Sequence, residues 1–66
     1  MTVDRLGEDD IELLALLASG LSLDSVARRL DTSDRTIRRR MHRICARIGV
    51  RSTVEAVVWA VRRGLL

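Results

Sequence analysis

The sequence predicts a single all-α domain of four helices spanning residues 1–66, and three observations lead to this expectation. The chain has 66 residues, which is enough for one small domain. It contains no Pro, so no strong helix breaker interrupts it. Its apolar residues recur at the three- and four-residue spacing of amphipathic helices, and four glycines divide these runs.

The first two predicted helices cover residues 8–19 and 23–30. The acidic side chains between Glu8 and Glu12 fall in the first turn of the first helix, where the positive end of the helix dipole favours negative charge. Gly20 is expected to end this helix. Ser22 is placed to cap the second helix by accepting a hydrogen bond from a free backbone amide.

The third and fourth predicted helices cover residues 34–48 and 53–63. Ser33 can cap the third helix, and Ser52 with Glu55 three residues later matches the capping box that starts the fourth. On the third helix, the residues predicted to face the core form one narrow stripe: Ile37, Met41, Ile44 and Ile48. On the fourth helix, we assign the core face to the valines Val54, Val57, Val58 and Val61.

Charge is distributed unevenly along the chain. Residues 1–34 contain three arginines and eight acidic residues, a net charge of −5, whereas residues 35–66 contain nine arginines and only Glu55, a net charge of +8. A protein with one basic side and one acidic side is suited to bind a polyanion through the basic side. A solvated basic face without any partner is the alternative explanation.

The third helix carries the residues expected to contact duplex DNA. Arginine can bridge the O6 and N7 atoms of guanine in the major groove, and side chains at the outward centre of a recognition helix reach base edges. Placing residues at about 100° intervals around the helix assigns Arg38, Arg39 and His42 to base contacts. Some of the arginines could instead pair with Asp24, Asp31 or Asp34, or lie in water.

Side chains on the flanks of a recognition helix and at the ends of neighbouring elements meet the sugar-phosphate backbone. Amides at the open N-terminal end of the third helix would assist them. The predicted phosphate contacts are Arg35, Thr36, Arg40, Arg43, Arg47 and Arg51.

The segment from Leu21 to Leu66 resembles the DNA-binding domain of the LuxR/FixJ/NarL-type (GerE-like) bacterial regulators. The residues that fall at the family's spacings are Gly20-Leu21-Ser22, Val26-Ala27, Leu30, Ser33, Thr36-Ile37-Arg38, Ile44, Ile48-Gly49-Val50 and Glu55-Ala56. The chain departs from the family pattern at residues 6–10, where a Thr-Pro-Arg-Glu start is usual. It also has Arg40 in place of a common His, and Asp34 in place of a common Pro.

The resemblance implies a helix-turn-helix formed by the second and third helices, in a transcription regulator that binds DNA half-sites as a dimer. It implies base contacts at Arg38, Arg39 and His42, and a position near the phosphate backbone for Thr36. It also implies that the fourth helix supports pairing of two domains.

A homodimer contact is predicted on the fourth helix, opposite its valines. Small residues beside a large aromatic allow close approach of two helices, and Trp is enriched at the centres of interfaces. The predicted contact residues are Ala56, Trp59, Ala60 and Arg63. Alternatively, Trp59 packs against the first helix or the N-terminal arm.

Other function classes are disfavoured. The chain has one Cys and one His, and it lacks a Ser, His and acid trio and a glycine-rich phosphate loop, so we expect no enzyme activity, no metal site and no cofactor. No apolar stretch is long enough to span a membrane, and the expected location is cytoplasmic, with the nucleoid. Two alternatives remain open: a module that docks on an acidic protein partner such as RNA polymerase, and a promoter-binding domain like region 4 of a sigma factor.

Overall fold

The computed structural model describes residues 6–66, and this part of the chain has the predicted all-α fold. The helices are α1 (Glu8–Ala18), α2 (Leu23–Arg29), α3 (Asp34–Ile48) and α4 (Thr53–Arg62). Each predicted helix boundary lies within one residue of the observed boundary. The first five residues of the predicted 1–66 domain lie outside the described residues.

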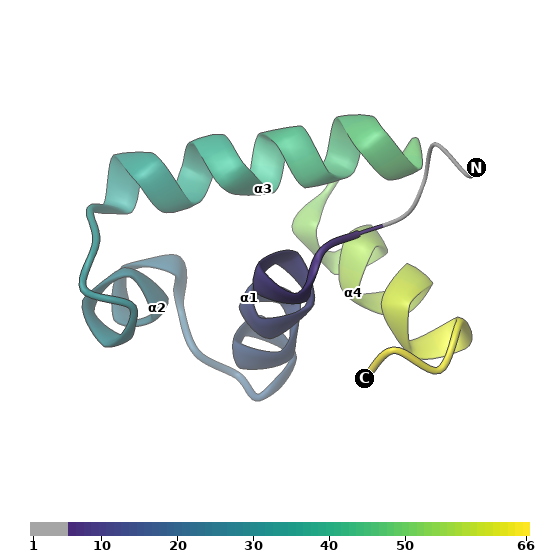
Figure 1. Cartoon of the computed structure of the whole chain (residues 1–66), viewed down its shortest axis with the longest axis horizontal. Coiled ribbons are helices and arrows are strands. Elements are labelled where there is room, and N and C mark those ends of the chain that lie inside the picture. The colour runs from purple at the N-terminus through teal and green to yellow at the C-terminus, as the bar shows by residue number, and fades with distance from the viewer. Residues whose placement is uncertain (1–5) are drawn as a thin grey trace.

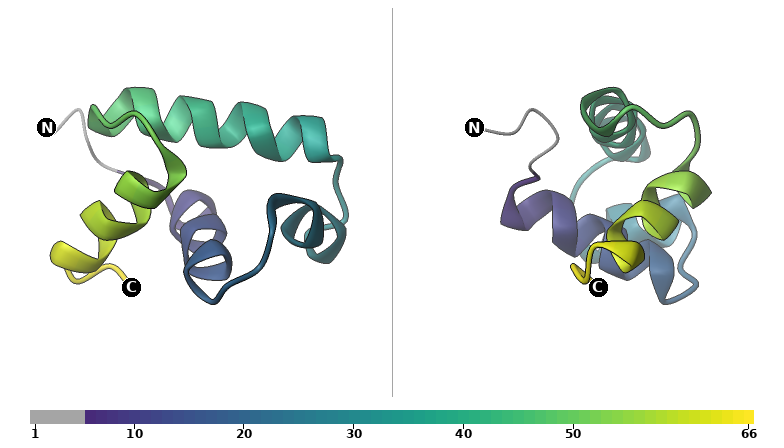
Figure 2. Two further views of the ribbon diagram at one scale, coloured as in Figure 1. Left: turned by 180° about the vertical axis from the view of Figure 1, so that it is seen from behind. Right: turned by 90° about the vertical axis from the view of Figure 1, so that its right-hand side faces the viewer.

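The four helices are arranged so that α3 lies across one side of the domain and the other three helices lie on the opposite side (Figures 1 and 2). The helix α2 packs against α3, α4 packs against both α3 and α1, and α1 also contacts α2. Because the partners of α3 among residues 6–66 lie on one side of it, the opposite face of the helix is not covered by any of the other three helices.

The core is formed by apolar side chains from all four helices. Its largest fully buried side chains are Leu13, Leu14, Val26, Ile37 and Ile44. The predicted core stripe of α3 is confirmed at Ile37, Met41 and Ile44, while Ile48 at the helix end is half-buried. This stripe fixes how α3 is rotated about its own axis, and therefore which of its side chains face outward.

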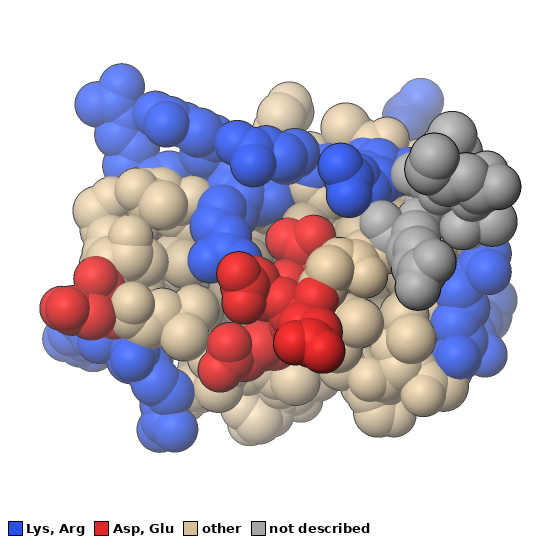
Figure 3. Space-filling view, viewed as in Figure 1, with Lys and Arg blue, Asp and Glu red and all other residues tan. Residues whose placement is uncertain are grey.

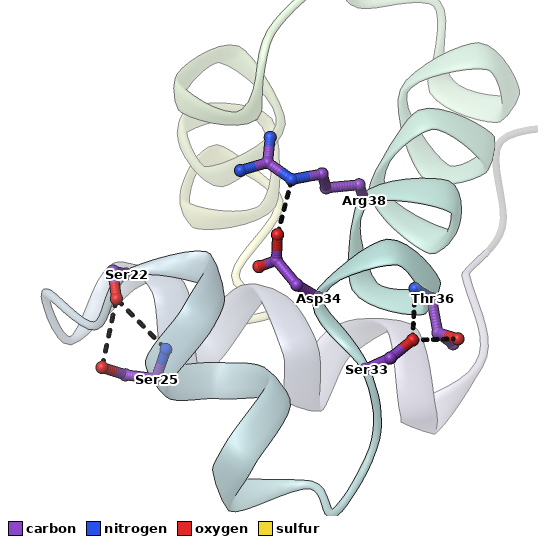
Figure 4. Close-up of polar contacts among 6 residues, drawn as sticks. All are labelled: Ser22, Ser25, Ser33, Asp34, Thr36 and Arg38. Carbon is purple, nitrogen blue, oxygen red and sulfur yellow. Dashed lines mark hydrogen bonds and ion pairs between the residues drawn. The ribbon is translucent and has the colours of Figure 1, made fainter.

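Serine side chains cap three helices as predicted. The Oγ atoms of Ser22, Ser33 and Ser52 accept hydrogen bonds from the backbone amides three residues later, at 3.1, 3.0 and 3.1 Å (Figure 4 shows the first two). At α4 the return contact differs from the capping box, because the Glu55 carboxylate accepts from the Arg51 amide at 3.1 Å. The first turns of all three helices thus have amides satisfied by side chains.

The turn between α2 and α3 is closed by backbone hydrogen bonds. The Thr32 amide donates to the Ala27 carbonyl at 2.9 Å, and the Asp31 amide donates to the Arg28 carbonyl at 3.2 Å. This is the Schellman pattern, which requires a left-handed residue after the helix, and Asp31 takes that conformation with φ 55°. The tight turn sets the angle between the two helices.

The predicted core face of α4 is confirmed only at Val57, which is half-buried against the core, and is wrong at the other three valines. Ala56 and Ala60 have no exposed surface and belong to the core, whereas Val54, Val58 and Val61 are 71%, 42% and 54% exposed. Small side chains at positions four residues apart let α4 approach α1 and α3 closely. The prediction favoured the larger apolar residues for the core because it considered hydrophobicity without this constraint on helix spacing.

Candidate nucleic-acid interface

The outward face of α3 is strongly basic. The stripe that carries Ile37, Met41 and Ile44 is buried, so the opposite side of the helix is turned to solvent. The exposed residues of α3 are Arg35, Arg38, Arg39, His42, Arg43, Ala46 and Arg47. In the space-filling view, basic side chains form a band along the edge of the molecule that α3 occupies (Figure 3).

The acidic residues lie mainly on a different part of the surface. Glu8 and Asp9 are exposed at the start of α1, and red side chains gather there, below the basic band (Figure 3). The fold therefore turns the charge asymmetry of the sequence into an asymmetry in space. A polyanion that approaches α3 meets the basic band first, because the acidic side chains at the start of α1 lie beside that band and not within it.

The structure places all three predicted base-contact residues on the exposed side of α3. Arg39 has no carboxylate within 4.0 Å among residues 6–66. Arg38 differs, because its Nε donates to Asp34 Oδ2 at 2.9 Å (Figure 4). This hydrogen bond and the negative charge of Asp34 raise the pKa of the Arg38 guanidinium.

A cleft of about 250 Å³ lies beside Arg38 and His42. Its other side is formed by the start of α4, where Arg51, Ser52 and Thr53 line it. The structure thus brings Arg51, predicted as a phosphate contact, next to two predicted base contacts that precede it in the sequence by nine or more residues. Cys45 also lines this cleft, and its thiol donates a hydrogen bond to the Ser52 carbonyl oxygen, with 3.6 Å between sulfur and oxygen.

The other flank of α3 faces the start of α1. Arg40 lies 4.0 Å from Asp10, and both side chains are largely covered, with 28% and 26% exposure. Arg43 lines a shallow cleft together with these two residues. Of the predicted phosphate contacts, Arg35, Arg43, Arg47 and Arg51 are exposed, whereas Arg40 is held against the body of the domain.

Thr36 belongs to the cap of α3. Its backbone amide donates to Ser33 Oγ, and the Ser33 hydroxyl donates to Thr36 Oγ1 at 2.9 Å (Figure 4). The Thr36 hydroxyl oxygen is an acceptor in this pair, so its own proton is available to an anion at the N-terminal end of α3. The predicted phosphate role is compatible with this geometry.

The exposed side of α4 forms a separate apolar surface. Val54 and Val58 line a groove of about 500 Å³ together with Val50, Glu55, Trp59, Arg62 and Arg63. Trp59 is half-buried and packs against the core, and the Arg63 guanidinium lies over its ring, 4.6 Å from the ring centroid. Sequence analysis found Trp59 and Arg63 but missed the exposed valines, whose spacing of four residues was the available signal.

The described residues offer neither a metal site nor a membrane-spanning helix. Within residues 6–66, no three His, Cys, Asp or Glu side chains are grouped so that they could hold a metal ion. In the same part of the chain, no helix is long and apolar enough to cross a membrane.

Comparison with known proteins gives a family match. The model of the family described as bacterial regulatory proteins, luxR family, matches residues 4–60. No solved structure gives a significant match.

Two curated relatives come from Bacillus subtilis (strain 168). The uncharacterized transcriptional regulatory protein YxjL is 32% identical over 57 residues, which cover 86% of this chain and 26% of that protein. The transcriptional regulatory protein YdfI is 34% identical over 62 residues, which cover 94% of this chain and 29% of that protein. The chain therefore spans less than a third of the length of these relatives.

Proposed function

Because the chain belongs to the luxR family of bacterial regulatory proteins, we propose that it is a sequence-specific DNA-binding domain whose helix α3 enters the major groove. The observation that carries this proposal is the outward face of α3, which is exposed within residues 6–66 and carries five arginines. Its 15 residues span about 22 Å, and a helix fits the width of the major groove.

The centre of this face supplies the base contacts. Arg39 projects from the middle of the open face, and Arg38 and His42 lie beside it. A guanidinium offers paired donors to guanine, and an imidazole can donate to or accept from a base edge. These three side chains read the sequence in the proposed complex.

The two flanks supply the phosphate contacts. Arg51 and the start of α4 lie on one flank of α3, and Arg43 with Arg40 lies on the other. Arg35 and Thr36 stand at the N-terminal end of α3 and Arg47 stands near its C-terminal end. Side chains on opposite flanks can hold the two strands that border the groove.

Two copies of the domain pair through α4 in this proposal. With Ala56 and Ala60 assigned to the core, the contact moves to the exposed valines, Val54, Val58 and Val61, next to Trp59 and Arg63. Contiguous exposed apolar side chains on a small domain are typical of an interaction surface. Dimer pairing would fix the spacing between two half-sites.

The proposal is tested by selecting bound duplexes from a random library and then measuring affinity for the selected site across a salt series. We expect a shared half-site, and log K that falls linearly with log salt by about 0.9 per phosphate contact. Arg39→Ala should lose discrimination at one base position, by about 1 to 3 kcal/mol. Arg43→Ala is the matched control, which should weaken all duplexes similarly.

Library selection without any enriched sequence would overturn the proposal. Equal losses on matched and mismatched sites from Arg39→Ala would remove Arg39 from the base contacts. Absence of DNA binding at low salt would instead favour an acidic protein as the partner of the basic face.

A further inference from the structure

The one carboxylate on α3 stands out against the charge of the rest of the helix. The helix contains six arginines and a single acidic residue, Asp34. A carboxylate near the phosphates of DNA is repelled by them, so phosphate binding does not account for Asp34. The contact of Asp34 with Arg38 does account for it, because Asp34 Oδ2 accepts a hydrogen bond from Arg38 Nε at 2.9 Å (Figure 4).

We propose that Asp34 is a positioning residue that holds Arg38 in one orientation toward a single base, and so sets part of the sequence preference of the domain. This inference rests on the DNA-binding function proposed above. It concerns Asp34, which the comparison with known proteins assigns no role, and it states how a base contact is selected.

The geometry of the pair leaves the end of the guanidinium open. Arginine has five N–H donors, of which one is on Nε and four are on the two terminal nitrogens. The contact with Asp34 uses Nε. The terminal pair of nitrogens is the edge that can bridge guanine O6 and N7, so one arginine can be held by Asp34 and bind a base at the same time.

The exposure of the two side chains agrees with such a bridging role. The Arg38 side chain is 66% exposed and the Asp34 side chain is 42% exposed, so the arginine projects from the surface while its anchor is closer to the helix. Held in this way, Arg38 loses less conformational freedom when it binds a base than an unrestrained arginine does.

The other oxygen of Asp34 makes no hydrogen bond. Asp34 Oδ1 is buried and has no hydrogen-bond partner among the described residues. A buried acceptor without a donor is unfavourable, so loss of the Arg38 contact at Oδ2 would leave the whole carboxylate without a side-chain donor. Arg39, one residue along, has no carboxylate within 4.0 Å in residues 6–66 and is free of this restraint.

The chain provides a matched control in Asp24 and Arg28 on α2. They have the same spacing of four residues and form an ion pair at 3.4 Å, with the Arg28 side chain 75% exposed and the Asp24 side chain 68% exposed. This pair lies outside the recognition helix. Removing its carboxylate changes the charge of the domain by the same amount without touching Arg38.

The test measures the affinities of the parent, Asp34→Asn and Asp24→Asn for the selected duplex and for all its single-base variants. We expect Asp34→Asn to lose about three- to tenfold of the discrimination at one base position, the size expected for coupled neighbours in one hydrogen-bond network. The same position should be the one affected by Arg38→Ala. Asp24→Asn should keep the parental preference at every position.

A double variant separates positioning from a general charge effect. In the Arg38→Ala background, Asp34→Asn should have no further effect on discrimination, because there is no arginine left to orient. The Nε proton resonance of Arg38 should be protected from exchange in the parent and exchange faster in Asp34→Asn, a readout that helix stability alone would not move.

The outcomes distinguish the two proposals. If Asp34→Asn keeps the parental base preference at every position, the role of Asp34 is overturned. The DNA-binding function is then unaffected. An equal effect of Asp34→Asn with and without Arg38 also overturns the role of Asp34. A parent that binds all duplexes equally overturns the DNA-binding function itself, and the inference with it.

Discussion

Asp10 at the start of α1 and Arg40 in the middle of α3 form an ion pair across the domain, with Asp10 Oδ1 and an Arg40 terminal nitrogen 4.0 Å apart. The Asp10 carboxylate also accepts a hydrogen bond from the Gly7 amide at 3.3 Å. The contact joins the acidic start of α1 to the basic helix α3.

Asp10→Asn should increase affinity for all duplexes, because Arg40 is released toward the phosphates and one repelling charge is removed. The slope of log K against log salt should become steeper by up to about 0.9, the value for one added phosphate contact. Asp9→Asn, at an exposed neighbour that forms no ion pair within residues 6–66, is the control. An equal gain from both variants would mean that the ion pair does not restrain Arg40.

Ala60→Leu should destabilise the domain, because Ala60 has no exposed surface and its neighbours leave no room for three more carbon atoms. Overpacking of this kind costs about 1 to 3 kcal/mol. Val61→Leu, at a neighbouring position that is 54% exposed, should change stability by less than about 0.5 kcal/mol. Urea unfolding of both variants checks this, and equal midpoints would contradict the observed packing of α4.

Val58→Glu should leave the domain folded and its affinity for one half-site unchanged, because Val58 is 42% exposed on the far side of α4 from the core. Affinity for a duplex with two half-sites should fall, since a buried unpaired charge at the contact between two copies is unfavourable. Titrations with duplexes carrying one and two half-sites measure both effects. Unchanged binding to the double site would remove α4 from the dimer.

Stability should fall with alkaline pH through Cys45. Burial, and to a lesser extent the charge of Glu55, raise the pKa of its thiol in the folded domain. The folded state then holds the proton more tightly than the unfolded chain. The contribution of the protonated Cys45 thiol to the free energy of unfolding is therefore complete below the ordinary thiol pKa of about 8.5. It is lost as pH rises through the pKa of the thiol in the folded domain.

Few other groups titrate in the pH range of this measurement, because the chain has no Tyr and all its basic residues other than His42 are Arg. No other side chain of the chain has an ordinary pKa between about 8 and 10.5, and the α-amino group is the one further group that titrates near this range. Urea unfolding across this range should show a decline in the free energy of unfolding that Cys45→Ser removes. A decline of the same size in Cys45→Ser would assign it to another cause.

Most of the fold could be predicted from local sequence signals. Ser22, Ser33 and Ser52 mark three helix starts, and their caps depend only on residues three positions away. The rotation of α3 followed from one narrow apolar stripe. Its regularity leaves a single way to bury the helix, which is why the exposed positions of Arg38, Arg39 and His42 were also predictable.

The orientation of α4 was not predictable in the same way, because its sequence offers two apolar faces. Local hydrophobicity favoured Val54, Val58 and Val61, but the close approach of α4 to its neighbours selects Ala56 and Ala60. That choice depends on distances between helices, which a single helix does not encode.

The same limit applied to two contacts at the interface. Asp10 and Arg40 are thirty positions apart, so their pair emerges only from tertiary packing. The pair of Asp34 and Arg38 is local, and their spacing of four residues on one helix was its signal. Sequence analysis allowed for such pairs but could not tell which arginine would be engaged.

The proposed DNA-binding surface is the exposed face of α3. The most direct measurement follows the backbone amide resonances of the domain while the selected duplex is added. We expect the largest shifts along α3 from Arg35 to Arg47 and at Arg51 to Thr53, with the acidic start of α1 little affected. Shifts that leave α3 unchanged and gather elsewhere on the surface would contradict it.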